Sequence, residues 1–290
     1  MPDVKALASE LEGYVVGMRR EFHRHPEISG HETHTRDVII RELEAMNVKY
    51  RLLDGTGIIA FIEGGKPGKN RVIRADIDAL PVQEEAENLC RRKECVSEIP
   101  GVCHDCGHDA HMFVLLGTMR LLLRMRDDVP GKVYCCFEEG EETNCGIDTM
   151  IDALKDYVVD ECFALHVYSG LDAGKINVVP GPPMAGTVGI GFHIKGRKGH
   201  GSRPDQAINP IIPAAHIITQ LNSAFMNQLN VEETVTLGLG KVTAGEATNV
   251  IPDDAYVGGT VRFFDPSEGE KALSIINRIV ENTAGSFMLS

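Results

Sequence analysis

The feature that most constrains this chain is a nine-residue segment crowded with metal-binding atoms. Residues 103–111 read CHDCGHDAH and hold two thiols, three imidazoles and two carboxylates. A second segment, FEEGEE at 137–142, adds four carboxylates. Polar groups at this density cost stability when they are buried, unless a charged partner lies among them. A divalent metal ion is the simplest such partner, so the first hypothesis is a metal site.

The first 180 residues alternate between helical and strand-like patterns. Apolar residues recur at helical spacing in 1–24, 32–46 and 109–125, while short apolar runs of strand length occupy 57–63, 71–75, 132–137 and 162–167. This alternation predicts an α/β domain with a mixed, largely parallel sheet flanked by helices. The two acidic and thiol-rich segments then follow strands, where open α/β sheets usually bind ligands.

The pattern changes after Gly181-Pro182-Pro183, which we interpret as a hinge. The order becomes β-α-β-β-α, with strands at 188–195, 233–242 and 255–264 and helices at 207–226 and 266–283. A split βαβ unit of this type closes with one more strand. We therefore predict a metal-binding catalytic domain over 1–182 and a smaller α+β domain over 183–290 that lacks its last strand.

Composition excludes several classes of function. A chain of 290 residues can form two domains, and its net charge of −13 argues against nucleic acid and anionic membranes as partners. No apolar run approaches the 18 residues of a membrane span, and the N-terminus lacks the apolar core of a signal peptide. Eight cysteines in a chain this long do not form a disulfide scaffold. We expect a cytoplasmic protein with reduced thiols.

Four interpretations compete for residues 103–111. A structural zinc site would use Cys90, Cys95, Cys103 and Cys106, but zinc ribbons prefer two Cys-x2-Cys pairs and this spacing matches poorly. A redox dithiol fits Cys103 and Cys106, without the expected thioredoxin-like context. An ordinary structural role suits one histidine better than three. The fourth interpretation is a catalytic metal site, in which Cys106 and His108 lie two residues apart in a turn.

Later strand ends offer the remaining groups for such a site. Glu141 and Glu142 follow the apolar strand at 132–137, although adjacent acids more often mean a solvated face. One glutamate could bind metal while its neighbour takes a proton from metal-bound water. His166 closes the run at 162–167; a lone histidine there is more often structural, but a metal site needs a third ligand of this kind.

Seven ordered motifs carry a family resemblance. They are RREFHRHPEIS from 19, RADIDALPVQE from 74, CHDCGHDAH from 103, FEEGEE from 137, ALHVYSGLDAGKI from 164, GHGSRPDQAINPI from 199 and ATNVIPDDAYVGGTVR from 247. Over most of 18–265 the chain resembles the metal-dependent amidohydrolase/peptidase family of hippurate hydrolase, N-acyl-amino-acid amidohydrolases and indole-acetyl-amino-acid hydrolases. The resemblance implies an enzyme that hydrolyses the amide bond of N-acyl amino acids or short peptides.

The resemblance also implies roles in the first domain. The metal ligands would be Cys106, His108, Glu142 and His166, which would hold two divalent ions. Zinc suits the thiolate and manganese suits the carboxylates, with cobalt or nickel as alternatives. Glu141 would be the general base and later the proton donor to the leaving amine. Asp76 and Asp78, in the RADIDALP segment, would support the ligands from behind.

In the second domain, three residues match positions that contact substrate in relatives. His200 would polarise the scissile carbonyl, while Asn249 and Arg262 would hold the substrate carboxylate. The domain itself resembles the lid or dimerisation domain of the family, so a homodimer through 183–290 is implied. Each of the three residues also has a plain interpretation, as a turn histidine, an asparagine cap and a surface arginine.

Departures from the family pattern carry their own expectations. Glu138-Glu139-Gly140 stands where many relatives have Gln-Pro-Ala, which predicts a more acidic entrance to the site, and Asp105 replaces a common small residue. Relatives continue beyond Ser290 and supply a last histidine ligand that His216, in the middle of a predicted helix, does not replace. The alternative function is therefore a truncated, catalytically impaired protein that binds metal and dimerises.

Overall fold

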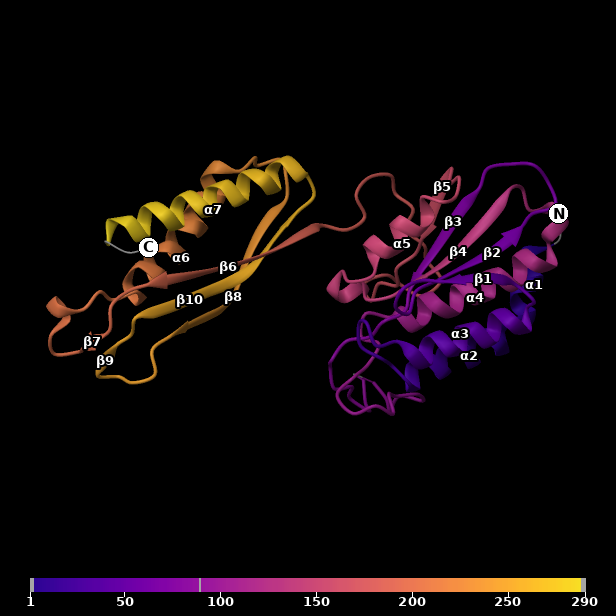
Figure 1. The fold of residues 1–290 in the computed structure, drawn as a ribbon, viewed down its shortest axis with the longest axis horizontal. Coiled ribbons are helices and arrows are strands. Elements are labelled where there is room, and N and C mark those ends of the chain that lie inside the picture. The colour runs from indigo at the N-terminus through magenta and orange to yellow at the C-terminus, as the bar shows by residue number, and fades with distance from the viewer. Residues whose placement is uncertain (1–2, 89, 288–290) are drawn as a thin grey trace. The chain divides into compact units, whose positions relative to one another are not determined.

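The computed structural model describes residues 3–88 and 90–287. Contacts between residues divide the chain into two compact units, Met1–Lys175 and Ile176–Ser290 (Figure 1). The predicted boundary, after residue 182, lies a few residues beyond this division. In the described part of the chain, no helix is both long and apolar enough to cross a membrane.

A five-stranded mixed sheet forms the centre of the first unit (Figure 1). Its order is β1-β2-β4-β3-β5, with bounds β1 Lys49–Leu52, β2 Ile58–Glu63, β3 Arg71–Asp76, β4 Lys132–Glu138 and β5 Glu161–Ala164. β3 pairs in parallel with β4 and with β5, whereas β1 with β2 and β2 with β4 are antiparallel. The predicted mixed α/β sheet is confirmed, and its parallel part consists of β4, β3 and β5.

Helices cover both faces of this sheet. One face carries α2 Glu12–Arg24, α3 Thr33–Ala45 and α4 His108–Arg124, and the other carries α5 Ile147–Leu154 (Figure 1). Alternate residues of β2 serve the two cores: Ala60 packs in the larger core, and Ile59 packs with Met150 of α5. Because both faces are buried, the central strands read as continuous apolar runs rather than as alternating ones.

Three local details of the first unit differ from the sequence-based expectation. The single helix predicted over 1–24 is two helices, α1 Val4–Glu10 and α2, separated at Leu11. β1 was not predicted, because KYRL is polar and only one residue of it is even partly buried at the sheet edge. α5 was missed because eight residues give too short a period to recognise.

The second unit is a three-stranded antiparallel sheet with two helices. β6 Gly186–Lys195, β10 Asp254–Phe263 and β8 Val235–Ala244 are ordered β6-β10-β8. α6 Ile211–Gln228 and α7 Pro266–Ser286 pack on the sheet through one apolar core (Figure 1). This is the predicted β-α-β-β-α order. A two-residue pair, β7 Gly199–His200 with β9 Val250–Ile251, is an addition.

α6 begins four residues later than predicted. Ile208 is engaged in a bridge with Arg197, and Pro204–Gln206 forms a 3-10 turn, so the chain cannot enter the helix at Ala207. The Asn209 side chain then accepts a hydrogen bond from the Ile211 backbone at the helix start (3.0 Å).

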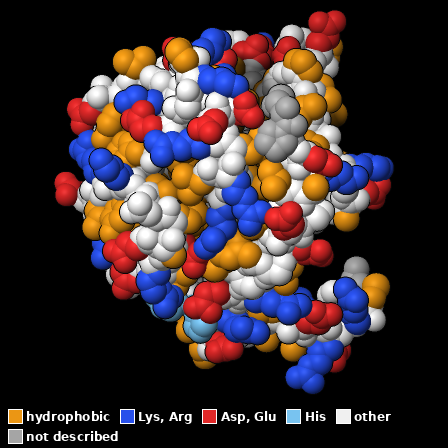
Figure 2. Space-filling view, turned by 90° about the vertical axis from the view of Figure 1, so that its right-hand side faces the viewer, with side chains coloured by type: hydrophobic (Ala, Val, Ile, Leu, Met, Phe, Trp, Pro, Cys, Tyr) orange, Lys and Arg blue, Asp and Glu red, His pale blue; other side chains and the backbone are white. Residues whose placement is uncertain are grey.

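Charged side chains of both signs are interspersed on the molecular face shown in Figure 2. Lys and Arg lie next to Asp and Glu across this face rather than in separate fields. A surface of this kind supports solubility and does not by itself attract a polyanion.

Candidate metal centre

The carboxyl ends of β3, β4 and β5 bring the predicted groups to one edge of the sheet. Because these strands are parallel and adjacent, the segments that follow them leave the sheet at the same side. Asp76 ends β3, with Asp78 two residues on. Glu141 and Glu142 form a 3-10 turn after β4, and His166 lies two residues beyond β5.

The start of α4 supplies Cys106 and His108 to the same place. His108 is the first residue of the helix and follows Gly107, whose φ of 86° lies in the left-handed region. A Cβ at Gly107 would lie 2.3 Å from Cγ2 of Val167, so only glycine allows this turn to approach the segment carrying His166.

The donor atoms of the five predicted residues converge. Cys106 Sγ lies 3.5 Å from Nε2 of His166, and Nε2 of His108 lies 3.7 Å from Oε1 of Glu142 and 3.9 Å from Oε2 of Glu141. Three donor triads share His108, completed by Cys106 with His166, by Glu141 with Glu142, and by Asp76 with His111. In each triad the ligand atoms lie within 4.8 Å of one another. The structure therefore brings together Cys106, His108, Glu141, Glu142 and His166.

The hydrogen bonding of these groups fits a metal ion. Nδ1 of His108 donates to Oδ1 of Asp78 (3.0 Å), which leaves Nε2 with its lone pair free. That Nε2 and Oε1 of Glu142 are buried and have no hydrogen-bond partner among the residues that the structure describes. In His166, Nδ1 donates to the Val167 carbonyl (2.6 Å), so Nε2 carries the lone pair, and it faces the Cys106 thiol at 3.5 Å. The two buried lone pairs of His108 and Glu142, 3.7 Å apart and without donors among the described residues, are what a cation stabilises.

The surroundings of the Cys106 thiol also favour a bound cation. Burial, together with the charges of Glu142 and Glu141, raises the pKa of Cys106 to about 12. A thiolate is therefore disfavoured among these carboxylates alone, whereas a coordinated cation deprotonates a thiol outright. The set of one sulfur, two imidazoles and a carboxylate suits zinc and other borderline divalent ions.

Two buried aspartates form hydrogen bonds with residues of the centre and of its surroundings. Oδ2 of Asp78 accepts hydrogen bonds from the Ser29 hydroxyl (2.7 Å) and the Glu142 backbone (3.0 Å), so Asp78 connects His108 with Glu142. Burial would raise the pKa of Asp78, but the hydrogen bonds from His108, Ser29 and the Glu142 backbone lower it. Burial would also raise the pKa of Asp76. The hydrogen bond from His111 and the charges of His108 and Arg74 outweigh burial and lower that pKa to about 2.

His111 is a residue of this network that the sequence analysis did not single out. Its Nδ1 donates to Oδ1 of Asp76 (2.5 Å), and its Nε2 accepts from the Val167 backbone (3.0 Å). Both nitrogens are used, so His111 holds the segment beside His166 rather than offering a ligand atom. The signal in the sequence is its position one helical turn after His108, which places both on one face of α4.

Glu141 is the most accessible acid of the group, with 41% of its side chain exposed. Burial raises its pKa, and the nearby carboxylates of Asp76 and Glu142 act in the same direction against the charge of His108. The preceding Gly140 has a φ of 60° and donates its N–H to buried Glu32 (2.9 Å), which fixes the turn. An accessible carboxylate with a raised pKa beside the donor cluster is suited to proton transfer.

The expectation of a more acidic entrance at Glu138 and Glu139 is wrong. Both side chains are buried. Glu138 accepts from Nε of Arg74 (2.8 Å), and Glu139 accepts from the Thr56 hydroxyl (2.7 Å) and from the backbone of Thr56 and Gly57. They brace the strand ends instead of facing incoming substrate.

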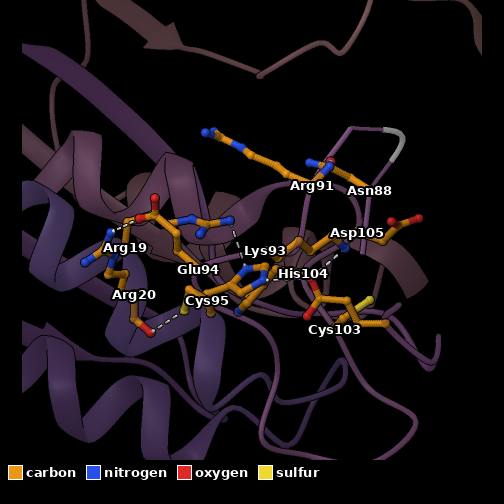
Figure 3. A pocket seen from close by; sticks show the side chains of 12 residues that line it. Arg19, Arg20, Asn88, Arg91, Lys93, Glu94, Cys95, Cys103, His104 and Asp105 are labelled. Atoms are coloured by element: carbon orange, nitrogen blue, oxygen red, sulfur yellow. Dashed lines mark hydrogen bonds and ion pairs between the residues drawn. The ribbon is translucent and has the colours of Figure 1, made fainter. Parts of the chain in front are cut away.

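The four-cysteine interpretation is not supported by the geometry. Among the described residues, the donor groups that could hold an ion include Cys106 but not Cys90, Cys95 or Cys103. Cys90 is exposed, and Cys95 lies with Cys103 in the wall of a pocket of about 420 Å³ (Figure 3). In this pocket His104 is buried, both its ring nitrogens lack partners, and burial lowers its pKa to about 4.

A chain of charged groups in the wall of that pocket reaches the start of α4. His23 contacts Oδ2 of Asp109 through Nδ1 (2.8 Å) and Oε1 of Glu84 through Nε2 (3.1 Å). Arg19 pairs with Asp109 (2.9 Å) and Lys93 with Glu84 (2.9 Å). This chain ties α2 to the start of α4 immediately after His108.

The three candidates of the second unit are all exposed. Nδ1 of His200 accepts from the Ser202 backbone (3.2 Å) and lies 2.8 Å from its hydroxyl, which leaves Nε2 as the protonated nitrogen. The carbonyl of Asn249 accepts from Gly201 (2.9 Å), so Asn249 lies next to the turn that carries His200. Arg262 lies on β10 between Thr187 and Thr236. His216 is exposed on α6 and stacks on Phe287.

Comparison with known proteins identifies the family. The model of peptidase family M20/M25/M40 matches residues 72–278. An N-acyl-L-amino acid amidohydrolase of Geobacillus stearothermophilus is 34% identical over 281 residues, which cover 96% of this chain and 75% of the relative. Thermostable carboxypeptidase 1 of Saccharolobus solfataricus is 32% identical over 282 residues, which cover 96% of this chain and 70% of the relative.

A solved structure agrees with these matches. A Bacillus subtilis protein described as a dinuclear metal-binding peptidase of the M20 family superposes with a TM-score of 0.79 at 32% identity, covering 99% of this chain and 72% of that protein. The family resemblance read from the motifs is thereby confirmed. The chain is a hydrolase of peptidase family M20/M25/M40.

Proposed function

We propose that this protein hydrolyses the amide bond between an acyl group and an amino acid, with Glu141 as the general base. The relative from Geobacillus stearothermophilus, named for the same reaction, supports this substrate class. The observation that carries the proposal is the accessible carboxylate of Glu141, 3.9 Å from the free nitrogen of His108 and inside the donor cluster.

We propose that the ligands Cys106, His108, Glu142 and His166 hold two divalent ions, zinc or manganese, with cobalt or nickel as alternatives. The dinuclear character of the Bacillus subtilis relative supports the number. Bound there, such ions supply Lewis-acid chemistry that lowers the pKa of a water molecule. Asp78 keeps the His108 ring in the tautomer that leaves Nε2 free, which is the usual task of a carboxylate behind a metal-binding histidine.

The protein's own groups then move the protons. The Glu141 carboxylate accepts a proton from the attacking water and later returns it to the leaving amine, for which its raised pKa is favourable. Nε2–H of His200 donates to the oxygen that becomes negative in the tetrahedral intermediate. Asn249 and Arg262 bind the carboxylate of the amino acid, the arginine through two parallel hydrogen bonds. We propose a cytoplasmic enzyme, dimeric through 183–290.

Replacement of Glu141 by glutamine tests the proposal. Glu141→Gln keeps the size of the side chain but cannot accept the proton, so we expect kcat to fall by about 10²–10⁴-fold. Metal content, measured by mass spectrometry, is expected to stay at the wild-type level. The matched control is Glu85→Gln, an exposed glutamate in the same unit. The assay uses N-acetyl, N-benzoyl and indole-acetyl amino acids.

Two outcomes contradict the proposal. Wild-type turnover in Glu141→Gln would remove Glu141 as the base. A wild-type chain that binds metal but hydrolyses none of the substrates would favour the alternative of a metal-binding dimerisation protein.

A further inference from the structure

We propose that the first unit carries a second, separate metal site, formed by Glu21, His25 and His34. Glu21 lies in the last turns of α2, His25 caps that helix, and His34 lies in the first turn of α3. One ligand atom of each residue lies within 4.8 Å of the other two. We call these three residues the α2–α3 site.

The distances in the α2–α3 site match those of a tetrahedral ion. Oε1 of Glu21 lies 3.6 Å from Nδ1 of His25 and 3.6 Å from Nε2 of His34. Ligands bonded at ~2.0–2.1 Å to a tetrahedral zinc are separated by about 3.3–3.4 Å. Small side-chain rotations therefore bring this carboxylate and the two imidazoles into coordination distance. The two histidine rings are already edge to face, with their centroids 5.0 Å apart.

The chemistry of the donor set selects the class of ion. Two imidazoles with one carboxylate form a ligand set found for zinc, and imidazole also suits copper and nickel. Hard ions such as magnesium and calcium prefer oxygen ligands and gain little from these rings. The three side chains are only half-buried, with exposed fractions of 35% for Glu21, 35% for His25 and 45% for His34, so a hydrated ion can reach them directly.

Glu98, which is not one of the three ligands, also favours the site. Nε2 of His25 faces Oε2 of Glu98 at 3.9 Å. Nδ1 of His25 lies 3.0 Å from the Glu21 carbonyl, a hydrogen bond that coordination through Nδ1 replaces. The ring proton then sits on Nε2 beside the Glu98 carboxylate, which is the carboxylate–histidine–metal arrangement seen at many metal sites. The negative charge of Glu21 also favours a cation here, whereas Glu98 already faces Arg24 at 3.7 Å.

The α2–α3 site is independent of the catalytic centre but lies at the base of a loop that supports it. None of its residues bonds to Cys106, His108, Glu142 or His166 in the described chain. The connection between α2 and α3 carries Ser29, whose hydroxyl donates to Asp78 (2.7 Å). An ion that joins the two ends of this connection is expected to stabilise the folded first unit, because it binds the native arrangement and not the unfolded chain.

Zinc stoichiometry tests the α2–α3 site. The full chain is stripped with a chelator, equilibrated with zinc at one fixed free concentration and analysed by mass spectrometry. His34→Ala and Glu21→Gln are each expected to bind one zinc equivalent fewer than the wild type. The matched control is His31→Ala, which removes an exposed histidine of the same connection outside the site and is expected to bind the wild-type number. The difference in bound zinc between the variants can be measured whether or not the chain hydrolyses any substrate.

Thermal unfolding gives a second readout on the same samples. Zinc is expected to raise the melting temperature of the wild type and of His31→Ala by more than that of His34→Ala. Wild-type zinc equivalents in both His34→Ala and Glu21→Gln would overturn the proposal, as would equal zinc-induced shifts in all variants. A chain without hydrolytic activity that still shows the one-equivalent difference would overturn the proposed reaction while supporting this site.

Discussion

The candidate residues of the first unit and those of the second differ in how they are held. In the first unit, His108 and Asp78 are fully buried and hydrogen bonded to each other, and Asp76 is fixed by His111 and Arg74. In the second unit, His200 and Arg262 are exposed and have few partners in their own unit. A buried network positions atoms before any ligand arrives, whereas an exposed side chain acquires its position only on binding.

This contrast predicts that substitutions in the two units affect different properties of the protein. Substitutions in the buried hydrogen-bond network of the first unit should disturb metal binding and stability together, because the same hydrogen bonds serve both. Substitutions of the exposed residues in the second unit should reduce turnover and leave the fold unchanged. The experiments below test each side of the comparison, from the largest expected effect to the smallest.

Among the following four experiments, replacement of His200 is expected to have the largest effect and to leave the fold unchanged. Under the proposed mechanism His200→Ala removes the donor to the developing negative charge, so we expect kcat to fall by about 10²–10³-fold. Metal content and the free energy of unfolding should stay at the wild-type level, because the side chain is exposed and its hydrogen bonds within the described residues are with Ser202. His216→Ala, an exposed histidine on α6 of the same unit, is the control and should keep full activity. Loss of stability in His200→Ala would contradict the claim that exposed residues of the second unit affect turnover and not the fold.

Replacement of Asp78 is expected to weaken metal binding by about 10–100-fold. Asp78→Asn keeps the shape of the side chain but no longer accepts the His108 proton as a carboxylate, so the ring is held less firmly. Metal affinity is measured by competition with a chromophoric chelator. Asp105→Asn changes an exposed aspartate of the adjacent segment and should retain wild-type affinity. Equal affinity in Asp78→Asn and the wild type would show that Asp78 does not orient the ligand.

Acid should destabilise the first unit through Asp76. Its pKa is about 2 in the folded protein against an ordinary value of 3.8, so the folded state favours the ionised form. This contribution is fully present above pH 4 and is lost as the pH falls toward 2; it amounts to about 2 kcal/mol. Urea unfolding of the metal-free chain between pH 5 and pH 2 measures it. Asp76→Asn should lack this part of the pH dependence, and an unchanged slope in that variant would contradict the assignment.

Replacement of Cys90 and Cys95 is expected to have the smallest effect. Cys90→Ala with Cys95→Ala removes one exposed thiol and one buried thiol that contacts the Arg20 carbonyl at 3.7 Å. Loss of that weak hydrogen bond should cost about 1 kcal/mol or less. Metal content should not change, since neither sulfur lies in a donor group. If the double variant, purified without any chelator, were unfolded and had lost its metal, that result would instead support the structural-zinc interpretation.

The sequence alone predicted the features that depend on local pattern. Apolar runs identified β2, β3 and β4, and the start of α4 was placed one residue from its observed position. The density of donors at 103–111 and 137–142 indicated the groups that the parallel strands bring together. The resemblance to relatives assigned the individual roles, which composition and spacing had left open.

What the sequence did not predict depends on partners distant in the chain. Glu138 and Glu139 look like a solvated acidic pair, yet Arg74 and Thr56 draw them into the interior. His111 looks like another ligand, and only its contacts with Asp76 and Val167 show that both nitrogens are occupied. Tertiary contacts of this kind leave no periodic signal in the sequence.

The central claim is that Cys106, His108, Glu142 and His166 hold the metal of this enzyme. Anomalous diffraction from crystals of the zinc-loaded chain measures it most directly, because the peaks locate each ion among the side chains. The account predicts ions in the centre bonded to these four residues, with a zinc–sulfur distance of ~2.3 Å to Cys106. Zinc absent from that centre, or held there by other side chains while these four remain uncoordinated, would contradict it.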